Sequence, residues 1–92
     1  MLRPPMRIRV QAFGMVRDLL RRSDFMLDLP QPATVLSAVT QIVDAAGPDA
    51  RRLILSPDGT RLKIVVRLDG ETARPDTPLY EGAGMKMMLG QH

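Results

Sequence analysis

The sequence has 92 residues, of which 45% are hydrophobic and 25% charged, with no cysteine and one histidine at the last position. This length suits a single small domain, and the lack of cysteine excludes a disulfide framework, a thiolate metal site and a cysteine nucleophile. The net charge of +3 is spread along the chain without a basic tail or an aromatic stacking set, so nucleic acid is not the expected partner. We expect one domain over residues 1–92, with residues 1–5 and 90–92 flexible.

Neither a membrane span nor a secretion signal is visible in the sequence. No apolar run approaches the roughly 18 residues that a membrane helix needs. The first ten residues lack the apolar stretch and small-residue cleavage site of a signal peptide. We therefore expect a cytoplasmic protein with no membrane partner.

Two segments in the first third of the chain alternate between apolar and polar residues. In residues 6–13 the even positions are apolar and Arg7, Arg9 and Gln11 lie between them, and residues 25–29 alternate in the same way up to Pro30. Both patterns predict half-buried strands. We expect an antiparallel hairpin whose wide loop, residues 14–24, contains a short helical turn.

Residues 34–46 have the periodicity of a helix. Thr34 is a favourable N-cap, Gly47 a favourable C-cap, and Pro48 prevents the helix from continuing. One apolar stripe follows helical spacing: Val35, Val39, Ile42, Val43 and Ala46.

The second half of the chain predicts two more strands. In residues 62–68, Leu62, Ile64, Val66 and Leu68 alternate with Lys63, Val65 and Arg67, after a turn at 56–59 and before a tight turn at Asp69-Gly70. Residues 71–84 are expected to be an irregular connection, and residues 85–89 a closing strand. This order predicts an α+β fold, a mixed four- to five-stranded sheet covered on one face by one main helix.

Four phrases occur in the order and spacing of a known family: "VQAFGMVRD" at 10–18, "PQPATV" at 30–35, "LDGE" at 68–71 and "DTPLYEGAGM" at 76–85. Over residues 6–89 the chain resembles the sulfur-carrier proteins of the ThiS/MoaD family. The resemblance implies their ubiquitin-like β-grasp fold, in which the first and last strands are central and parallel and the third lies beside the last.

The family's chemistry takes place at the end of the chain. There a C-terminal Gly-Gly enters an E1-like adenylating enzyme, and its carboxylate becomes an acyl adenylate and then a thiocarboxylate. In this sequence Leu89 is followed by a tail of Gly90, Gln91 and His92, without a diglycine. We therefore expect a non-covalent binding module or an accessory subunit of a larger enzyme. Two alternatives stay open: a sulfur carrier for molybdopterin or thiamin-type biosynthesis after C-terminal maturation, and an RNA-contacting β-grasp domain.

The sequence does not indicate an enzyme. Its carboxylates are scattered, and no paired-carboxylate or Ser/His/Asp arrangement is visible. We expect no catalytic residue, metal or cofactor, and a protein that acts with a larger partner. The resemblance implies an E1-like adenylating enzyme or a cofactor-synthesis enzyme as that partner.

The outward residues of the predicted sheet form the candidate partner-binding surface. Basic side chains would surround a small apolar centre next to the tail, which suits an acidic protein surface. A charged row is also typical of a merely solvated sheet face. The candidate residues are Arg7, Arg9, Lys63, Val65, Arg67, Lys86, Met88 and Leu89.

Overall fold

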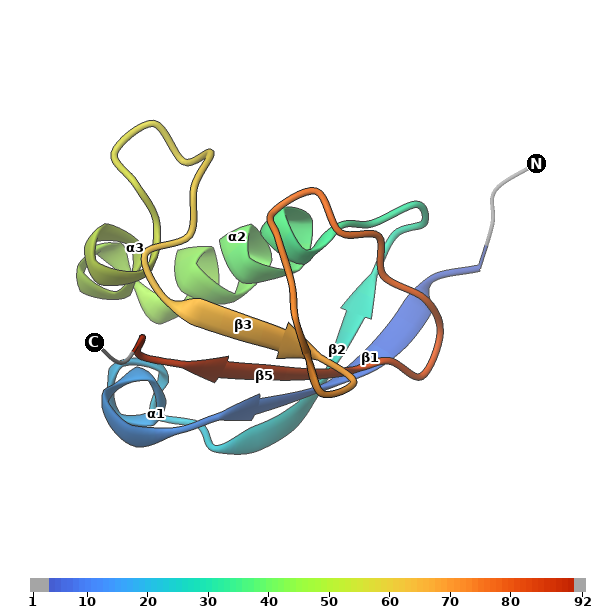
Figure 1. Ribbon diagram of the computed structural model, residues 1–92, viewed down its shortest axis with the longest axis horizontal. Helices are drawn as coiled ribbons and strands as arrows, with labels where there is room; N and C mark the ends of the chain where they lie inside the picture. Colours follow the sequence, from blue (N-terminus) through green and yellow to red (C-terminus); the bar gives the residue numbers. More distant parts are fainter. Residues whose placement is uncertain (1–3, 91–92) are drawn as a thin grey trace.

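The computed structural model describes residues 4–90, and helices lie against a twisted five-stranded sheet (Figure 1). The expectations for residues 1–3, and for Gln91 and His92 of the tail, lie outside the described residues. Both ends of the described chain lie close to the sheet. The carbonyl of Pro4 accepts a hydrogen bond from Gln31 Nε2 at 2.9 Å, and a Cβ placed on Gly90 would lie 3.4 Å from Val65 Cγ2.

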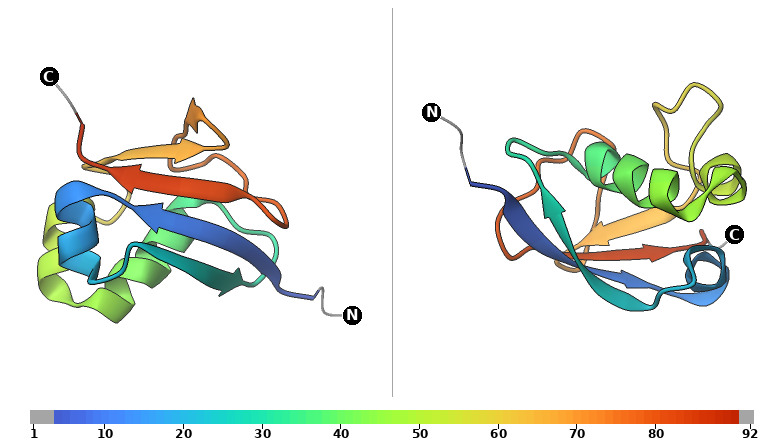
Figure 2. Two further views of the ribbon diagram at one scale, coloured as in Figure 1. Left: turned by 90° about the horizontal axis from the view of Figure 1, so that it is seen from below. Right: turned by 180° about the vertical axis from the view of Figure 1, so that it is seen from behind.

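Two strands from opposite ends of the chain form the centre of the sheet. β1 (Met6–Ala12) pairs in parallel with β5 (Gly84–Met88) and antiparallel with β2 (Asp24–Leu29). β3 (Val65–Leu68) is antiparallel to β5, and β4 (Glu71–Thr72) forms the far edge. The order β2-β1-β5-β3-β4 confirms the predicted central, parallel pair (Figure 2).

The core lies between this sheet and α2 (Val35–Ala46). The inward residues of the two central strands are fully buried, among them Ile8, Val10, Met85 and Met87. Each such side chain contributes roughly 1.5–3 kcal/mol when it leaves water. The buried stripe of α2 consists of Val35, Ala38, Val39, Ile42 and Val43. The predicted member Ala46 is exposed, because it lies at the end of the helix, beyond the last turn that faces the sheet.

Thr34 caps α2 as predicted. Its hydroxyl oxygen accepts a hydrogen bond from the Ser37 N–H at 3.2 Å, and the Ser37 hydroxyl oxygen accepts one from the Thr34 N–H at 2.8 Å. This reciprocal capping box satisfies two backbone donors at the start of the helix. The helix ends at Gly47, whose φ of 114° favours glycine.

The structure contains two short helices besides the main one. α1 (Gly14–Leu20) occupies the loop where only a helical turn was expected, and α3 (Pro48–Ile54) was not expected at all. Each buries one pair of residues one turn apart, Val16 with Leu20 and Ala50 with Ile54. Pro48 does stop α2, but it also begins α3, because proline is favourable at the first position of a helix.

The third strand is shorter than residues 62–68. Leu62 pairs with Leu55, and the Lys63 N–H donates to the Ile54 carbonyl at 2.8 Å, so this stretch joins the end of α3 before the sheet begins at Val65. Conversely, Glu71–Thr72 was expected to be irregular and forms β4. The Asp69-Gly70 turn, with φ of 50° and 89°, closes this hairpin as predicted.

Replacing Thr34 with alanine tests the capping box. Thr34→Ala should lower the free energy of unfolding by about 1 kcal/mol, because the Ser37 N–H loses its acceptor. Thr34→Ser keeps the acceptor and is the matched control. Urea denaturation of the two variants and the parent measures the effect, and equal stability of the alanine and serine variants would contradict it.

Candidate functional site

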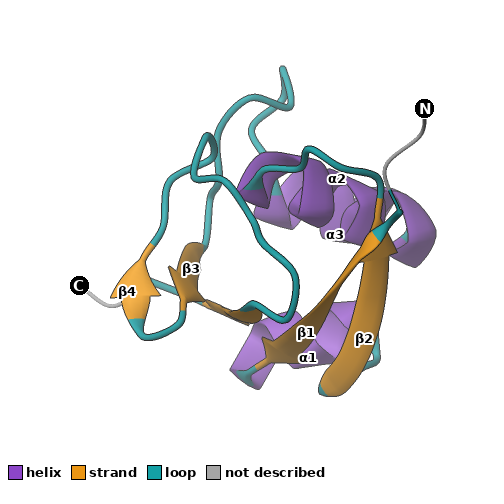
Figure 3. Cartoon of the chain, turned by 90° about the vertical axis from the view of Figure 1, so that its right-hand side faces the viewer, coloured by secondary structure: helices purple, strands orange, loops and turns teal. Residues whose placement is uncertain are grey.

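α2 and α3 lie on one side of the sheet and leave the other side uncovered (Figure 3). We call the uncovered side the open face; the left view of Figure 2 looks onto it. The strict alternation of burial along β1 places Arg7, Arg9 and Gln11 on this face. Met26 on β2, Arg67 on β3 and Lys86 on β5 share it through the strand register.

One half of the open face, on β1 and β2, is electrically compensated. The Arg7 guanidinium binds both oxygens of Asp28 at 2.8 and 3.4 Å, and the Arg9 guanidinium binds both oxygens of Asp24 at 3.0 and 2.6 Å. These bidentate bonds match a planar donor pair to a carboxylate. They lower the pKa of Asp24 and of Asp28, with the arginine hydrogen bond as the largest cause in each case.

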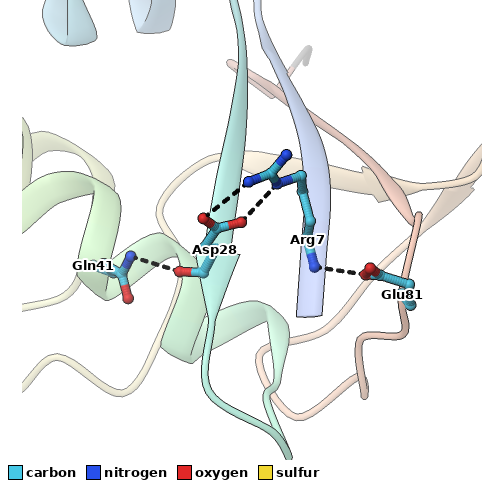
Figure 4. Close-up of polar contacts among 4 residues, drawn as sticks. All are labelled: Arg7, Asp28, Gln41 and Glu81. Atoms are coloured by element: carbon cyan, nitrogen blue, oxygen red, sulfur yellow. Dashed lines mark hydrogen bonds and ion pairs between the residues drawn. The ribbon is translucent and has the colours of Figure 1, made fainter. Parts of the chain in front are cut away.

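Further contacts hold the Arg7 end of this half (Figure 4). The Arg7 backbone N–H donates to Glu81 Oε2 at 2.6 Å, and its carbonyl accepts from the Gly82 N–H at 2.8 Å. On β2, the Asp28 carbonyl accepts a hydrogen bond from Gln41 Nε2 of α2 at 3.1 Å. Arg7 is therefore engaged by neighbours through both its backbone and its side chain.

The other half, on β5 and β3, carries uncompensated positive charge. Arg67 and Lys86 lie directly opposite each other in the antiparallel register. Both are exposed, and neither forms an ion pair with any residue between 4 and 90. Like charges directly opposite each other destabilise a sheet. We call this pair the basic row.

An apolar row lies next to the basic row, at the end of the sheet where the chain leaves β5. Val65 is directly opposite Met88. The Phe13 N–H donates to the Met87 carbonyl at 3.0 Å, and Phe13 is extended (φ −126°, ψ 151°), so it continues the register of β1 and comes beside Met88. Phe13 is 43% exposed, whereas Val65 and Met88 are half-buried. We call Phe13, Met88 and Val65 the apolar row.

Phe13 was missed as a surface residue, although the predicted strand included it, because the outward positions were not followed past Gln11. The alternation of β1 held the signal, since Phe13 takes the outward position after Gln11. The acidic partners Asp24 and Asp28 were missed as well. Their outward positions follow from the alternation of residues 24–29, but their contact with arginines depends on the register with β1.

Two other predicted residues lie at the margins of the basic and apolar rows. Leu89 is 45% exposed and follows the last residue of β5. Lys63 precedes β3, and its ammonium group donates to the Arg52 carbonyl of α3 at 3.0 Å. Lys63 is therefore directed to the helical layer and does not join the basic row.

Residues 4–90 hold no group of three or more His, Cys, Asp or Glu side chains that could bind a metal ion. Over the same range, no helix combines the length and the apolar character that a membrane span requires.

Several solved structures of small proteins share this fold. The small archaeal modifier protein 1 of H. volcanii has a TM-score of 0.81 and 20% sequence identity, covering 94% of this chain and 99% of that one. Urm1 of Trypanosoma brucei has a TM-score of 0.67 and 20% identity, covering 99% and 98%. A chain in the complex of subunits 1 and 2 of the molybdopterin-converting factor of Helicobacter pylori has a TM-score of 0.57 and 17% identity, covering 95% and 97%.

These similarities confirm the predicted ubiquitin-like β-grasp fold. They also agree, at the level of the fold, with the resemblance to the ThiS/MoaD proteins. No protein-family model matches the sequence, and a search of curated protein sequences finds no match.

The arginine–aspartate pairs predict a specific pH dependence. Since Arg9 holds the pKa of Asp24 below its ordinary value of 3.8, the pair stabilises the fold above that pH, and this contribution is lost as the pH falls through the lowered pKa. Arg9→Gln should raise the pKa of Asp24, and Arg67→Gln should leave it unchanged. Carboxyl ¹³C NMR titration measures both, and an equal Asp24 pKa in the parent and Arg9→Gln would contradict the assignment.

Proposed function

We propose that this protein is a docking module that binds a larger protein non-covalently through the apolar row and the basic row. The observation that carries the proposal is their adjacency at one end of the open face. Phe13 is exposed there beside the half-buried Met88 and Val65, and the uncompensated cations Arg67 and Lys86 lie two residues away along β3 and β5.

The two rows contribute differently to binding. Covering the apolar row removes Phe13 and Met88 from water, which provides the favourable free energy of association. The basic row then selects the partner, because charges at the margin of an interface mainly steer encounter and exclude wrong surfaces. The matching surface has an apolar centre with carboxylates on one side.

The compensated half of the open face is less suited to the same partner. An acidic group that approached Arg7 or Arg9 would have to displace Asp28 or Asp24 from an existing bidentate contact. Arg67 and Lys86 require no such exchange. We therefore centre the contact on β5 and β3, and assign Arg7 and Arg9 to the structure of the sheet.

The comparisons support a protein partner of a particular kind. A chain of this fold occurs in a complex of two subunits of a molybdopterin-converting factor. We propose that the partner here is likewise a larger subunit of a cofactor-synthesis enzyme, or an E1-like adenylating enzyme, as the resemblance to the ThiS/MoaD family implies. In either case the protein supplies a surface, and the partner supplies the catalytic groups.

Charge reversal at the basic row tests the docking surface. Proteins that co-purify with the tagged parent from its own cells are identified, purified and tested for direct binding. Arg67→Glu should slow association with the true partner about tenfold and weaken its salt dependence, because the steering charge is inverted. Biolayer interferometry at two salt concentrations measures the rates.

Arg61→Glu is the matched control. Arg61 is exposed in the loop after α3, and its replacement by glutamate changes the net charge by the same amount as Arg67→Glu. It should bind at nearly the parent's rate. Equal slowing by Arg67→Glu and Arg61→Glu would reduce the effect to net charge and contradict a localised docking surface.

A sulfur-carrier activity is the second candidate, and the similarity to a small modifier protein and to a molybdopterin-converting factor favours it. In this mode the same two rows would dock the activating enzyme. Leu89 and Gly90 leave the sheet beside the apolar row and would lead the chain terminus into that enzyme.

Intact-mass spectrometry tests the carrier activity. The chain as given, and a chain shortened to end at Gly90 that represents the matured form, are each incubated with ATP, a sulfur donor and the E1-like enzyme of the protein's own source. A carrier gains the mass difference between sulfur and oxygen at its terminal carboxylate. In a parallel reaction, the same enzyme must thiocarboxylate its known substrate. If it does so and the masses of both chains are unchanged, the carrier function is excluded and the non-covalent docking function remains.

A further inference from the structure

The outer edge of β2 has backbone groups that face away from the sheet. β2 is an edge strand, paired only with β1. The Ala12 N–H donates to the Ser23 carbonyl at 3.0 Å, and in an antiparallel ladder every second residue bonds to the partner strand. Phe25, Leu27 and Leu29 therefore bond to β1. The N–H and C=O groups of the alternate residues, Asp24, Met26 and Asp28, point to the free edge.

Within the described residues, a hydrogen bond from the rest of the protein closes one end of this edge. The Asp28 carbonyl accepts the hydrogen bond from Gln41 of α2, which confirms that it faces outward. Within residues 4–90, no helix or loop makes a hydrogen bond to the outward backbone groups of Met26. Unpaired edge groups of this kind are a template for another strand.

A pocket of about 180 Å³ opens beside the free edge, between β2 and α2. Leu20, Phe25, Leu27 and Ile42 form its apolar part, and the small Ala45 and Ala46 leave it accessible. The polar side chains of Arg22 and Gln41 also line it. A cavity of about 150 Å³ accepts benzene, so this pocket has room for one large apolar side chain. Because alternate residues of an added strand would face α2, one of them would point into the pocket.

The Asp24 end of this groove is basic. The Arg22 guanidinium lies over the Phe25 ring, 5.1 Å from its centre, and lines the pocket. In the part of the chain that the structure describes, neither Arg21 nor Arg22 forms an ion pair. The neighbouring carboxylate of Asp24 is held by Arg9.

We propose that the edge of β2 binds an extended acidic segment of another protein as an added strand. The backbone of that segment pairs with Met26, one apolar side chain fills the pocket, and its acidic side chains face Arg21 and Arg22. Strand addition of this kind takes affinity from main-chain hydrogen bonds and specificity from the pockets for alternate side chains. None of these residues belongs to the apolar row or the basic row, so the proposal is independent of the docking function.

The probe is a fluorescein-labelled synthetic peptide, a short run of valine and isoleucine followed by glutamates, titrated by fluorescence anisotropy. Met26→Pro removes the outward N–H without loss of a bond to β1, because proline is tolerated where the N–H faces solvent. It should weaken binding about tenfold or more, which corresponds to one lost hydrogen bond. Met26→Ala keeps the N–H and should bind like the parent; circular dichroism checks that both variants are folded.

Arg22→Glu and Arg61→Glu form the matched charge pair. Arg22→Glu should weaken binding about tenfold, Arg61→Glu should not, and a peptide with lysines in place of the glutamates should not bind the parent. The proposal is overturned if the parent does not bind the peptide, if Met26→Pro binds like Met26→Ala, or if both arginine variants weaken binding equally.

Sedimentation velocity of the parent alone tests whether the protein pairs with itself through the same edge. A concentration-dependent dimer that Met26→Pro abolishes would assign the edge to a second copy of this chain, and would also overturn the proposal.

Discussion

The parallel pairing of β1 with β5 is the contact on which the rest of the structure depends. It joins the two ends of the chain in the middle of the sheet. Its inward residues Ile8, Val10, Met85 and Met87 are buried in the core on the side of the sheet that α2 covers. Because parallel strands end at the same edge, Phe13 and Met88 meet there although they are far apart in sequence. The apolar row and the exit of the chain at Leu89 both follow from this one pairing.

The charges of the open face are divided by the same strand order. β2 supplies carboxylates to the arginines of β1, whereas β3 brings Arg67 against Lys86 of β5. A face that reads as uniformly basic in sequence is thus neutral over one half and positive over the other. Opposed like charges weaken the sheet, and the proposed docking function would give a physical reason for their position beside the apolar row.

The sequence was sufficient to predict the fold and much of the open face. Period-two alternation predicted β1, β2 and, with too early a start, β3, and Thr34 and Gly47 marked the ends of α2 correctly. What it could not supply depends on contacts between segments. α3 is stabilised by the burial of Ala50 and Ile54 in the core. Leu62 pairs with Leu55 and therefore does not extend β3. The pairing of Arg9 with Asp24 requires the hairpin register, and the position of Phe13 requires the parallel one.

The most direct test is methyl NMR of the protein bound to its purified partner, with the methionine methyl groups labelled. Met88 lies in the proposed docking surface, while Met26 lies on the compensated half of the same face and is 54% exposed. The account predicts a large shift or broadening of the Met88 signal and little change at Met26. A perturbed Met26 with an unchanged Met88 would contradict it.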